Sequence, residues 1–142
     1  MKRYLLDTSI VSESTKPQPA IAVANWLGER DAADLFIATL TIAEIWRGIL
    51  NLPRGRRRAA LEDWFAGAEG PQFLFLGRIL AFDQAAAFEW ARLMAAGRQV
   101  GRARSPLDMI IAATAAANDC IVVTANERHF VDAVEIINPL RQ

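Results

Sequence analysis

The sequence is poor in the residues on which several common kinds of site depend. Of its 142 residues, one is cysteine and one is histidine, namely Cys120 and His129. A single cysteine excludes an internal disulfide and a cysteine-based zinc site, and we expect Cys120, which has apolar neighbours, to be a buried core thiol. A single histidine excludes a metal site with several histidines and leaves one candidate for a nucleophile relay. We expect His129 to be a half-buried turn residue.

Lysine is almost as scarce, since Lys2 and Lys16 are the only two. Phosphatases of the haloacid dehalogenase type and phospho-receiver domains both need a lysine late in the chain, so they fit poorly. Residues 97–101 lack the spacing of a glycine-rich phosphate loop. No apolar run approaches the roughly 20 residues of a membrane span, and the N-terminus lacks a signal peptide's apolar stretch. We therefore expect a cytoplasmic protein with no membrane association.

Hydrophobic residues make up 53% of the chain, enough for a sizeable core in a single domain over residues 1–142. The formal net charge is zero, but arginine supplies nearly all of the sixteen cationic residues. Two clusters stand out, formed by Arg54, Arg56, Arg57 and Arg58 and by Arg98, Arg102 and Arg104. Arginine binds phosphate in a fork geometry, so both clusters are candidates for nucleic-acid binding. The alternative for each is a solvated surface.

Apolar runs and helical patterns alternate along the chain. Strands are predicted at Arg3–Leu6, Leu35–Ala38, Cys120–Val123 and 134–137, and one more lies within 73–82. Helices are predicted over 19–29, 42–52 and 56–68, from a cap at Asp83 to about Gly97, and from Ser105 to about Asn118. Strands separated by helices predict a parallel sheet with right-handed crossovers and helices on both faces.

Carboxylates stand beside core-forming sequence at three points. Asp7 lies at the end of the first predicted strand, and Glu44 is expected in the first turn of the helix that follows the second predicted strand. Asp108 opens the helix that leads to the strand at Cys120, and Asn126 follows that strand. In a parallel sheet these positions share the carboxyl edge, where ligand sites collect. Convergent carboxylates repel one another unless they are protonated or bridged by a cation, and oxygen ligands alone favour Mg²⁺ or Mn²⁺.

Helix capping is the structural alternative at each of these positions. Residues 41–44 and 105–108 match the capping-box pattern, Asp7 can cap a turn, and Asn126 can cap a short turn before Phe130. Capping, however, does not require three acidic groups to converge on one sheet edge. The conjunction therefore favours a cation site.

Segments 5–13, 42–48 and 106–115 resemble, in order and spacing, the three acidic motifs of PIN-domain proteins. Segments 121–130 and 137–139 resemble the closing part of the same family, so the resemblance spans essentially the whole chain. Within the family, the chain looks most like the VapC and FitB toxins of type II toxin–antitoxin modules. The resemblance implies a PIN-like three-layer α/β/α sandwich around a central, mainly parallel sheet of four to five strands.

The same resemblance implies an endoribonuclease that hydrolyses RNA phosphodiester bonds with Mg²⁺ or Mn²⁺. Asp7, Glu44 and Asp108 match the family's metal-binding acids, and Thr124 matches a hydroxyl residue that orients a water or a carboxylate. The fourth family position, often Asp, is Asn126 here. Asn offers a carbonyl oxygen in place of a carboxylate, so we expect weaker metal binding than with four acids.

The implied partners are an RNA substrate and a cognate antitoxin whose DNA-binding domain connects the toxin to operator DNA. The antitoxin is expected to lay an apolar helix into a groove of the toxin, and a homodimer, a heterotetramer and larger toxin–antitoxin assemblies are implied. The alternative function is non-enzymatic: a catalytically weak or inactive PIN-fold module that strengthens the antitoxin's binding to operator DNA.

Overall fold

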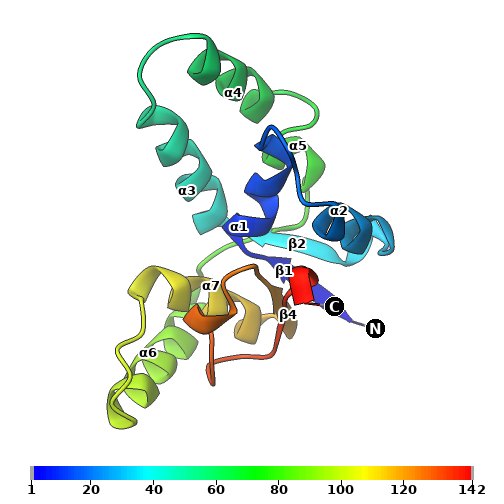
Figure 1. Ribbon diagram of the computed structural model, residues 1–142. Coiled ribbons are helices and arrows are strands. Elements are labelled where there is room, and N and C mark those ends of the chain that lie inside the picture. The colour runs from blue at the N-terminus through cyan, green and yellow to red at the C-terminus, as the bar shows by residue number, and fades with distance from the viewer. Residues whose placement is uncertain (1, 142) are drawn as a thin grey trace.

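The structure is a computed structural model that describes residues 2–141. Its centre is a five-stranded sheet with the strand order β3-β2-β1-β4-β5, in which all neighbouring strands are parallel (Figure 1). The strands are β1 (Arg3–Leu6), β2 (Leu35–Ala38), β3 (Ile79–Leu80), β4 (Cys120–Val123) and β5 (Ile136–Ile137). The predicted parallel sheet of four to five strands is confirmed.

Helices lie on both faces of the sheet, which gives the predicted three layers (Figure 1). They are α1 (Thr8–Val11), α2 (Ile21–Gly28), α3 (Thr39–Leu50), α4 (Arg56–Ala66), α5 (Pro71–Leu74), α6 (Gln84–Gln99) and α7 (Pro106–Ala117). Short 3₁₀ turns occur at Ser12–Thr15, Ala32–Asp34, Glu127–His129 and Pro139–Arg141. None of the helices within residues 2–141 has both the length and the apolar character that crossing a membrane requires.

The two faces of the sheet are filled by alternate residues of the same strands. In β1, Leu5 packs with residues of α6 and α7, whereas Tyr4 and Leu6 pack with residues of α1 and α2. In β4, Val122 packs with the first group and Val123 with the second. Successive strand side chains point to opposite faces, so an apolar run with no polar interruption forms a strand that is buried on both. This explains why β1 and β4 are central.

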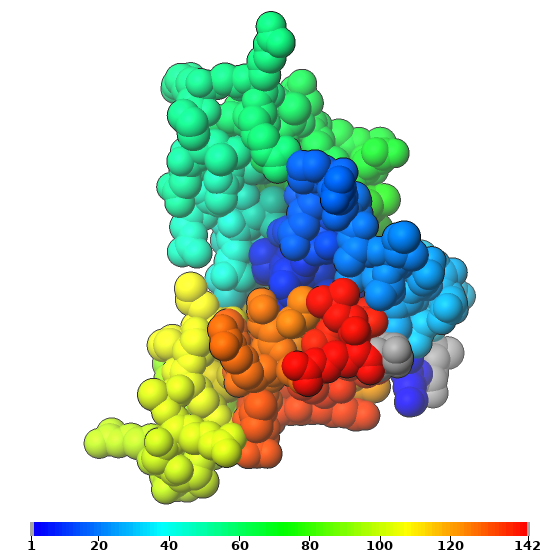
Figure 2. Space-filling view, viewed as in Figure 1, coloured from blue at the N-terminus to red at the C-terminus, as the bar shows by residue number. Residues whose placement is uncertain are grey.

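A third, smaller core joins α3 to α4 and lies beyond the sheet. Ile45, Ile49 and Phe65 are buried there. The two helices form a hairpin that extends away from the sheet, with its connecting loop at the far end (Figures 1 and 2). The hairpin therefore carries the arginines that follow α3 away from the carboxyl edge of the sheet.

Several predicted boundaries shift in the structure. The helix predicted over 42–52 begins earlier, at Thr39, so Glu44 lies in its second turn and not in its first. Thr41 is a buried residue inside this helix and does not cap it, so the capping-box alternative at 41–44 is wrong. The strand predicted at 134–137 contains only Ile136–Ile137, and the segment 73–82 contains the end of α5 as well as β3. Cys120 is a buried free thiol, as predicted, and burial raises its pKa.

Candidate active site

The register of the two central strands places Asp7 beside Thr124. Leu6 of β1 pairs with Val123 of β4, and the next residue of each strand continues past the carboxyl edge of the sheet. The backbone N–H of Asp7 donates to the carbonyl of Val123 at 2.8 Å. Asp7 then caps the short helix α1, because its Oδ1 accepts from the N–H of Thr8 at 2.8 Å. The capping role suggested by the sequence is present, and further contacts of Asp7 go beyond it.

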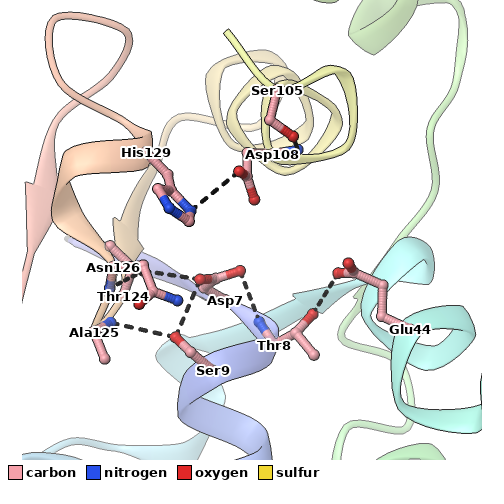
Figure 3. Close-up of polar contacts among 10 residues, drawn as sticks. All are labelled: Asp7, Thr8, Ser9, Glu44, Ser105, Asp108, Thr124, Ala125, Asn126 and His129. Carbon is pink, nitrogen blue, oxygen red and sulfur yellow. Dashed lines mark hydrogen bonds and ion pairs between the residues drawn. The ribbon is translucent and has the colours of Figure 1, made fainter. Parts of the chain in front are cut away.

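Hydroxyl groups hold the second carboxylate oxygen of Asp7. Its Oδ2 accepts from Thr124 Oγ1 at 2.8 Å and from Ser9 Oγ at 3.1 Å (Figure 3). The residue is only 6% exposed. Burial raises the pKa of Asp7 above its ordinary value, the hydrogen bonds from Thr124, Ser9 and Thr8 oppose this rise, and the negative charge of Asp108 adds to it. Asp7 is thus a fixed carboxylate in surroundings that disfavour its negative charge.

Asp108 faces Asp7 from the first turn of α7 (Figure 3). Ser105 caps this helix, since its Oγ accepts from the N–H of Asp108 at 3.3 Å. The Asp108 side chain turns to the turn after β4, where its Oδ2 lies 3.2 Å from His129 Nδ1. The helix N-terminus favours a negative charge at this position. Asp7 and Asp108 therefore form a pair of like charges at the predicted edge.

Glu44 approaches the pair through Thr8. Thr8 Oγ1 donates to Glu44 Oε1 at 2.7 Å and lies 3.1 Å from Thr41 Oγ1. In Figure 3 Thr8 lies between the carboxylate of Asp7 and that of Glu44. Glu44 thus contacts α1, the helix that Asp7 caps, but it does not join Asp7 and Asp108 in a group of three carboxylates. No group of three or more His, Cys, Asp or Glu side chains converges as a metal site within residues 2–141.

Asn126, the neutral fourth position, is exposed and lies in the turn before Glu127–His129. Its backbone N–H donates to Thr124 Oγ1 at 2.9 Å, so the same hydroxyl that holds Asp7 also fixes the turn. Ser9 has a similar double role, because its Oγ also accepts from the N–H of Ala125 at 3.3 Å. The two hydroxyls thus connect the turn after β4 to the Asp7 carboxylate.

The pair of Asp7 and Asp108 fits a hard divalent cation. Both side chains offer only oxygen, their like charges face each other, and burial leaves Asp7 in need of a compensating positive charge. Magnesium is commonly held by one or two protein carboxylates together with water and substrate phosphate oxygens, so a third acid in direct contact is not required. Asp7 and Asp108 can hold such an ion, with Glu44 close by.

The predicted arginines occupy two separate places. Arg54, Arg56 and Arg57 are exposed at the far end of the α3–α4 hairpin, away from Asp7 and Asp108 (Figures 1 and 2). Arg102 and Arg104 belong to the loop before α7 and line a groove that also contains Asp108. The structure thus separates the two clusters, and only the second adjoins the acidic pair.

Sequence reasoning did not connect two residues of the turn after β4 with Asp108, namely Arg128 and His129, the second of which it predicts only as a half-buried turn residue. His129 is 41% exposed at its side chain and contacts Asp108, and Arg128 lines the same groove. Asp108 and His129 belong to different elements, and no motif in the sequence connects them. The one signal in the sequence was that Arg128 and His129 closely follow Asn126, which the predicted topology places at the carboxyl edge of the sheet.

The raised pKa of Asp7 predicts a pH dependence of folding stability in the absence of divalent ions. A carboxyl group whose pKa is higher in the folded chain favours folding at low pH, and this contribution is lost as the pH rises from 3.8 through the folded-state pKa. Asp7→Asn cannot titrate. We therefore expect its Tm minus that of the wild type, measured in EDTA, to increase from about pH 4.5 to about pH 7.5. A difference that stays constant or decreases would contradict the burial of Asp7.

The model of the PIN domain family matches residues 4–135. The VapC ribonuclease Y4jK of Sinorhizobium fredii is 35% identical to the chain over 136 residues, which are 95% of this chain and 96% of that protein. Toxin FitB of Neisseria gonorrhoeae is 33% identical over 136 residues, with the same coverage of 95% and 96%. A solved structure of FitAB bound to the IR36 DNA fragment superposes with a TM-score of 0.88 at 32% identity, covering 96% of this chain and 94% of that one.

Proposed function

We propose that the chain, which belongs to the PIN domain family, is the toxin of a type II toxin–antitoxin module. Its proposed activity is that of an endoribonuclease that hydrolyses RNA phosphodiester bonds. The observation that carries this proposal is the pair of Asp7 and Asp108, two carboxylates that face each other at the carboxyl edge of the sheet. The similarity to a VapC ribonuclease and to toxin FitB over nearly the whole chain supports it.

The proposed activity depends on Mg²⁺ or Mn²⁺, held by Asp7 and Asp108 with Glu44 beside them. When bound, such an ion supplies positive charge to the phosphate and makes a water easier to deprotonate. The chain's own contribution is orientation. Thr124 and Ser9 fix the Oδ2 atom of Asp7, and the cap of α7 fixes the backbone from which Asp108 extends. Such outer hydrogen bonds set the direction in which a carboxylate presents its lone pairs.

Glu44 and Asn126 complete the proposed site at its margins. Glu44 accepts a hydrogen bond from Thr8, directly next to Asp7 in the chain, so it is positioned to hold a water or a second ion. Asn126 is exposed beside Thr124 and offers an amide group in the same turn. In this proposal Asp7, Glu44, Asp108, Asn126 and Thr124 form the catalytic set.

The proposed protein partner is an antitoxin with a DNA-binding domain, and the similarity to FitAB, which was solved bound to a DNA fragment, supports this. A groove of about 360 Å³ is available for an apolar antitoxin helix, on the face of the sheet that carries α1 and α2. Ile10, Val23, Leu27 and Phe75 line it, and Glu13 is among its acidic residues. Through the antitoxin the toxin would reach operator DNA in the cytoplasm, as a homodimer, a heterotetramer or a larger assembly.

The direct test is cleavage of RNA by the purified chain after removal of its antitoxin. We expect cleavage with Mg²⁺ or Mn²⁺, none with EDTA, and recovery when the ion is restored. Addition of purified antitoxin should then stop the reaction. Cleavage that persists undiminished in EDTA would contradict an ion-dependent ribonuclease.

A second function is favoured by one observation, the neutral Asn126 in a site where three acids do not converge among the described residues. In this alternative the chain is a catalytically weak or inactive module that strengthens the antitoxin's binding to operator DNA. A gel-shift titration separates the two functions. Tighter operator binding with the toxin, together with no RNA cleavage under any divalent ion, is the outcome that favours the alternative.

A further inference from the structure

A groove of about 390 Å³ opens beside Asp108. The loop before α7 forms one wall and the turn after β4 forms the other, and these two segments lie side by side on the face shown in Figure 2. The polar lining residues are Arg102, Arg104, Ser105, Asp108, Arg128 and His129. The groove therefore connects Asp108, one member of the acidic pair, to a surface rich in arginine.

Arg104 supports the wall of the groove. Its Nη1 donates to the carbonyl of Leu93 at 2.6 Å, and its Nη2 donates to the carbonyl of Asp132 at 3.3 Å. Its aliphatic stem lies against Gly97, where an added Cβ would come within 2.7 Å of Arg104 Cδ. Because its donors are directed at backbone carbonyls, Arg104 joins α6 to the turn after β4. Arg104 thus uses both of its terminal nitrogens to hold the two walls in place.

Arg102 and Arg128, in contrast, can turn to a ligand. Arg102 Nη1 lies 3.1 Å from Asp132 Oδ2, but both side chains are more than half exposed. An exposed pair of this kind contributes little stability, so Arg102 can exchange Asp132 for another anion at small cost. Arg128 is exposed and makes no side-chain hydrogen bond or ion pair to the rest of residues 2–141.

We propose that this groove binds single-stranded RNA, and that Arg102 and Arg128 hold the phosphate next to the one placed at Asp7 and Asp108. The inference rests on the ribonuclease function proposed above. A site made of carboxylates alone repels the polyanion that it has to cut, and arginines beside it offset that repulsion. One guanidinium group binds two oxygens of a phosphate at once, so it fixes the position of the RNA backbone as well as attracting it.

The location of the groove favours it over the other arginine cluster. Arg128 is the immediate neighbour of His129, which contacts Asp108. Arg54, Arg56 and Arg57 lie at the far end of the α3–α4 hairpin (Figure 1). An RNA strand held only at the far end of the α3–α4 hairpin would have to run the length of that hairpin before it reached Asp7 and Asp108. A phosphate adjacent to the scissile one can reach the groove directly.

The test is binding of a short fluorescein-labelled single-stranded RNA, followed by anisotropy in EDTA so that no cleavage occurs. The groove variant is Arg102→Gln/Arg128→Gln. The control variant, Lys2→Gln/Arg92→Gln, removes the same charge from exposed residues that do not line the groove. We expect the groove variant to bind about tenfold more weakly or worse, since it cannot form charge-assisted hydrogen bonds to phosphate. Its slope of log affinity against log salt should fall in magnitude by about 0.7 for each phosphate that the variant no longer neutralises.

The inference would be overturned by wild-type affinity in the groove variant, by an equal loss in the control variant, or by a larger loss in Arg54→Gln/Arg56→Gln, which removes two charges from the hairpin. Equal binding of duplex DNA, with an equal loss in the groove variant, would show a general polyanion site and would also overturn it. Cleavage of the same RNA with Mg²⁺ is measured separately. RNA bound through the groove but never cut would refute the proposed ribonuclease alone, whereas cleavage without a groove effect would refute the groove alone.

Discussion

Asp7→Asn is expected to lower the rate of Mg²⁺-dependent RNA cleavage by at least about 10³-fold. The substitution keeps the shape of the side chain but removes its negative charge at the point where the chain faces Asp108. Without that charge the divalent ion loses one of the two carboxylates that we expect to hold it. Initial rates on a labelled RNA, at saturating Mg²⁺, measure the effect. Asp108→Asn should produce a loss of the same order.

A matched control for this substitution is Asp119→Asn. Asp119 is exposed at the amino end of β4, on the opposite edge of the sheet, and has a φ of 54°. Asn tolerates that left-handed conformation well, so the control changes one carboxylate without straining the backbone. Full activity in Asp119→Asn, with circular dichroism spectra alike in all variants, assigns the loss to the site. Undiminished cleavage by well-purified Asp7→Asn protein would refute the role of Asp7.

Thr124→Val is the second substitution with a large expected effect. The hydroxyl of Thr124 donates to Asp7 Oδ2 and accepts from the N–H of Asn126, and the residue is fully buried. Valine has nearly the same shape but leaves both partners without this bond. We expect kcat/KM to fall about 10- to 100-fold, as for other groups that orient metal ligands. The free energy of unfolding should fall by about 1–3 kcal/mol, because buried polar groups are left unpaired.

Two further variants separate positioning from simple destabilisation. Thr124→Ser keeps the hydroxyl and should recover most of the activity. Thr114→Val makes the same change at another fully buried threonine, whose hydroxyl donates to the carbonyl of Ile110 within α7. We expect this variant to keep its activity. Urea unfolding gives the stability of each variant, and a loss of activity that follows stability alone, in all three, would argue against a positioning role.

The limits of the three central strands could be predicted from the sequence, because their short apolar runs indicate buried strands. Leu35–Ala38 and Cys120–Val123 are short apolar runs, Arg3–Leu6 is apolar after its first residue, and the structure reproduces the predicted limits of all three. The caps at Asp83 and Ser105 were equally clear, since each side chain accepts from a backbone N–H of the first turn. Local hydrogen bonding and burial on both faces decide these elements, and both are visible in a few consecutive residues.

Other elements depend on distant contacts that the sequence does not display. The start of α3 was missed because Ala38 caps the helix without any side-chain bond, and because Thr41 is buried beside Thr8 from another part of the chain. β5 was predicted too long, since the pairing with β4 decides its limits. The same reason applies to the site. Asp7 and Asp108 could be assigned to one sheet edge from topology, but the contact between Asp108 and His129 joins two loops whose approach only the packed fold defines.

Asp7 and Asp108 are expected to hold a divalent cation together, and the proposed ribonuclease activity depends on this. Calorimetric titration of Mn²⁺ into the chain, freed of metal with EDTA and dialysed, tests the cation site without reference to activity. We predict saturable heat from the wild type and from Asp119→Asn, and loss of that heat in Asp7→Asn and in Asp108→Asn. No saturable heat from the wild type, or an unchanged isotherm in Asp7→Asn, would contradict the cation site.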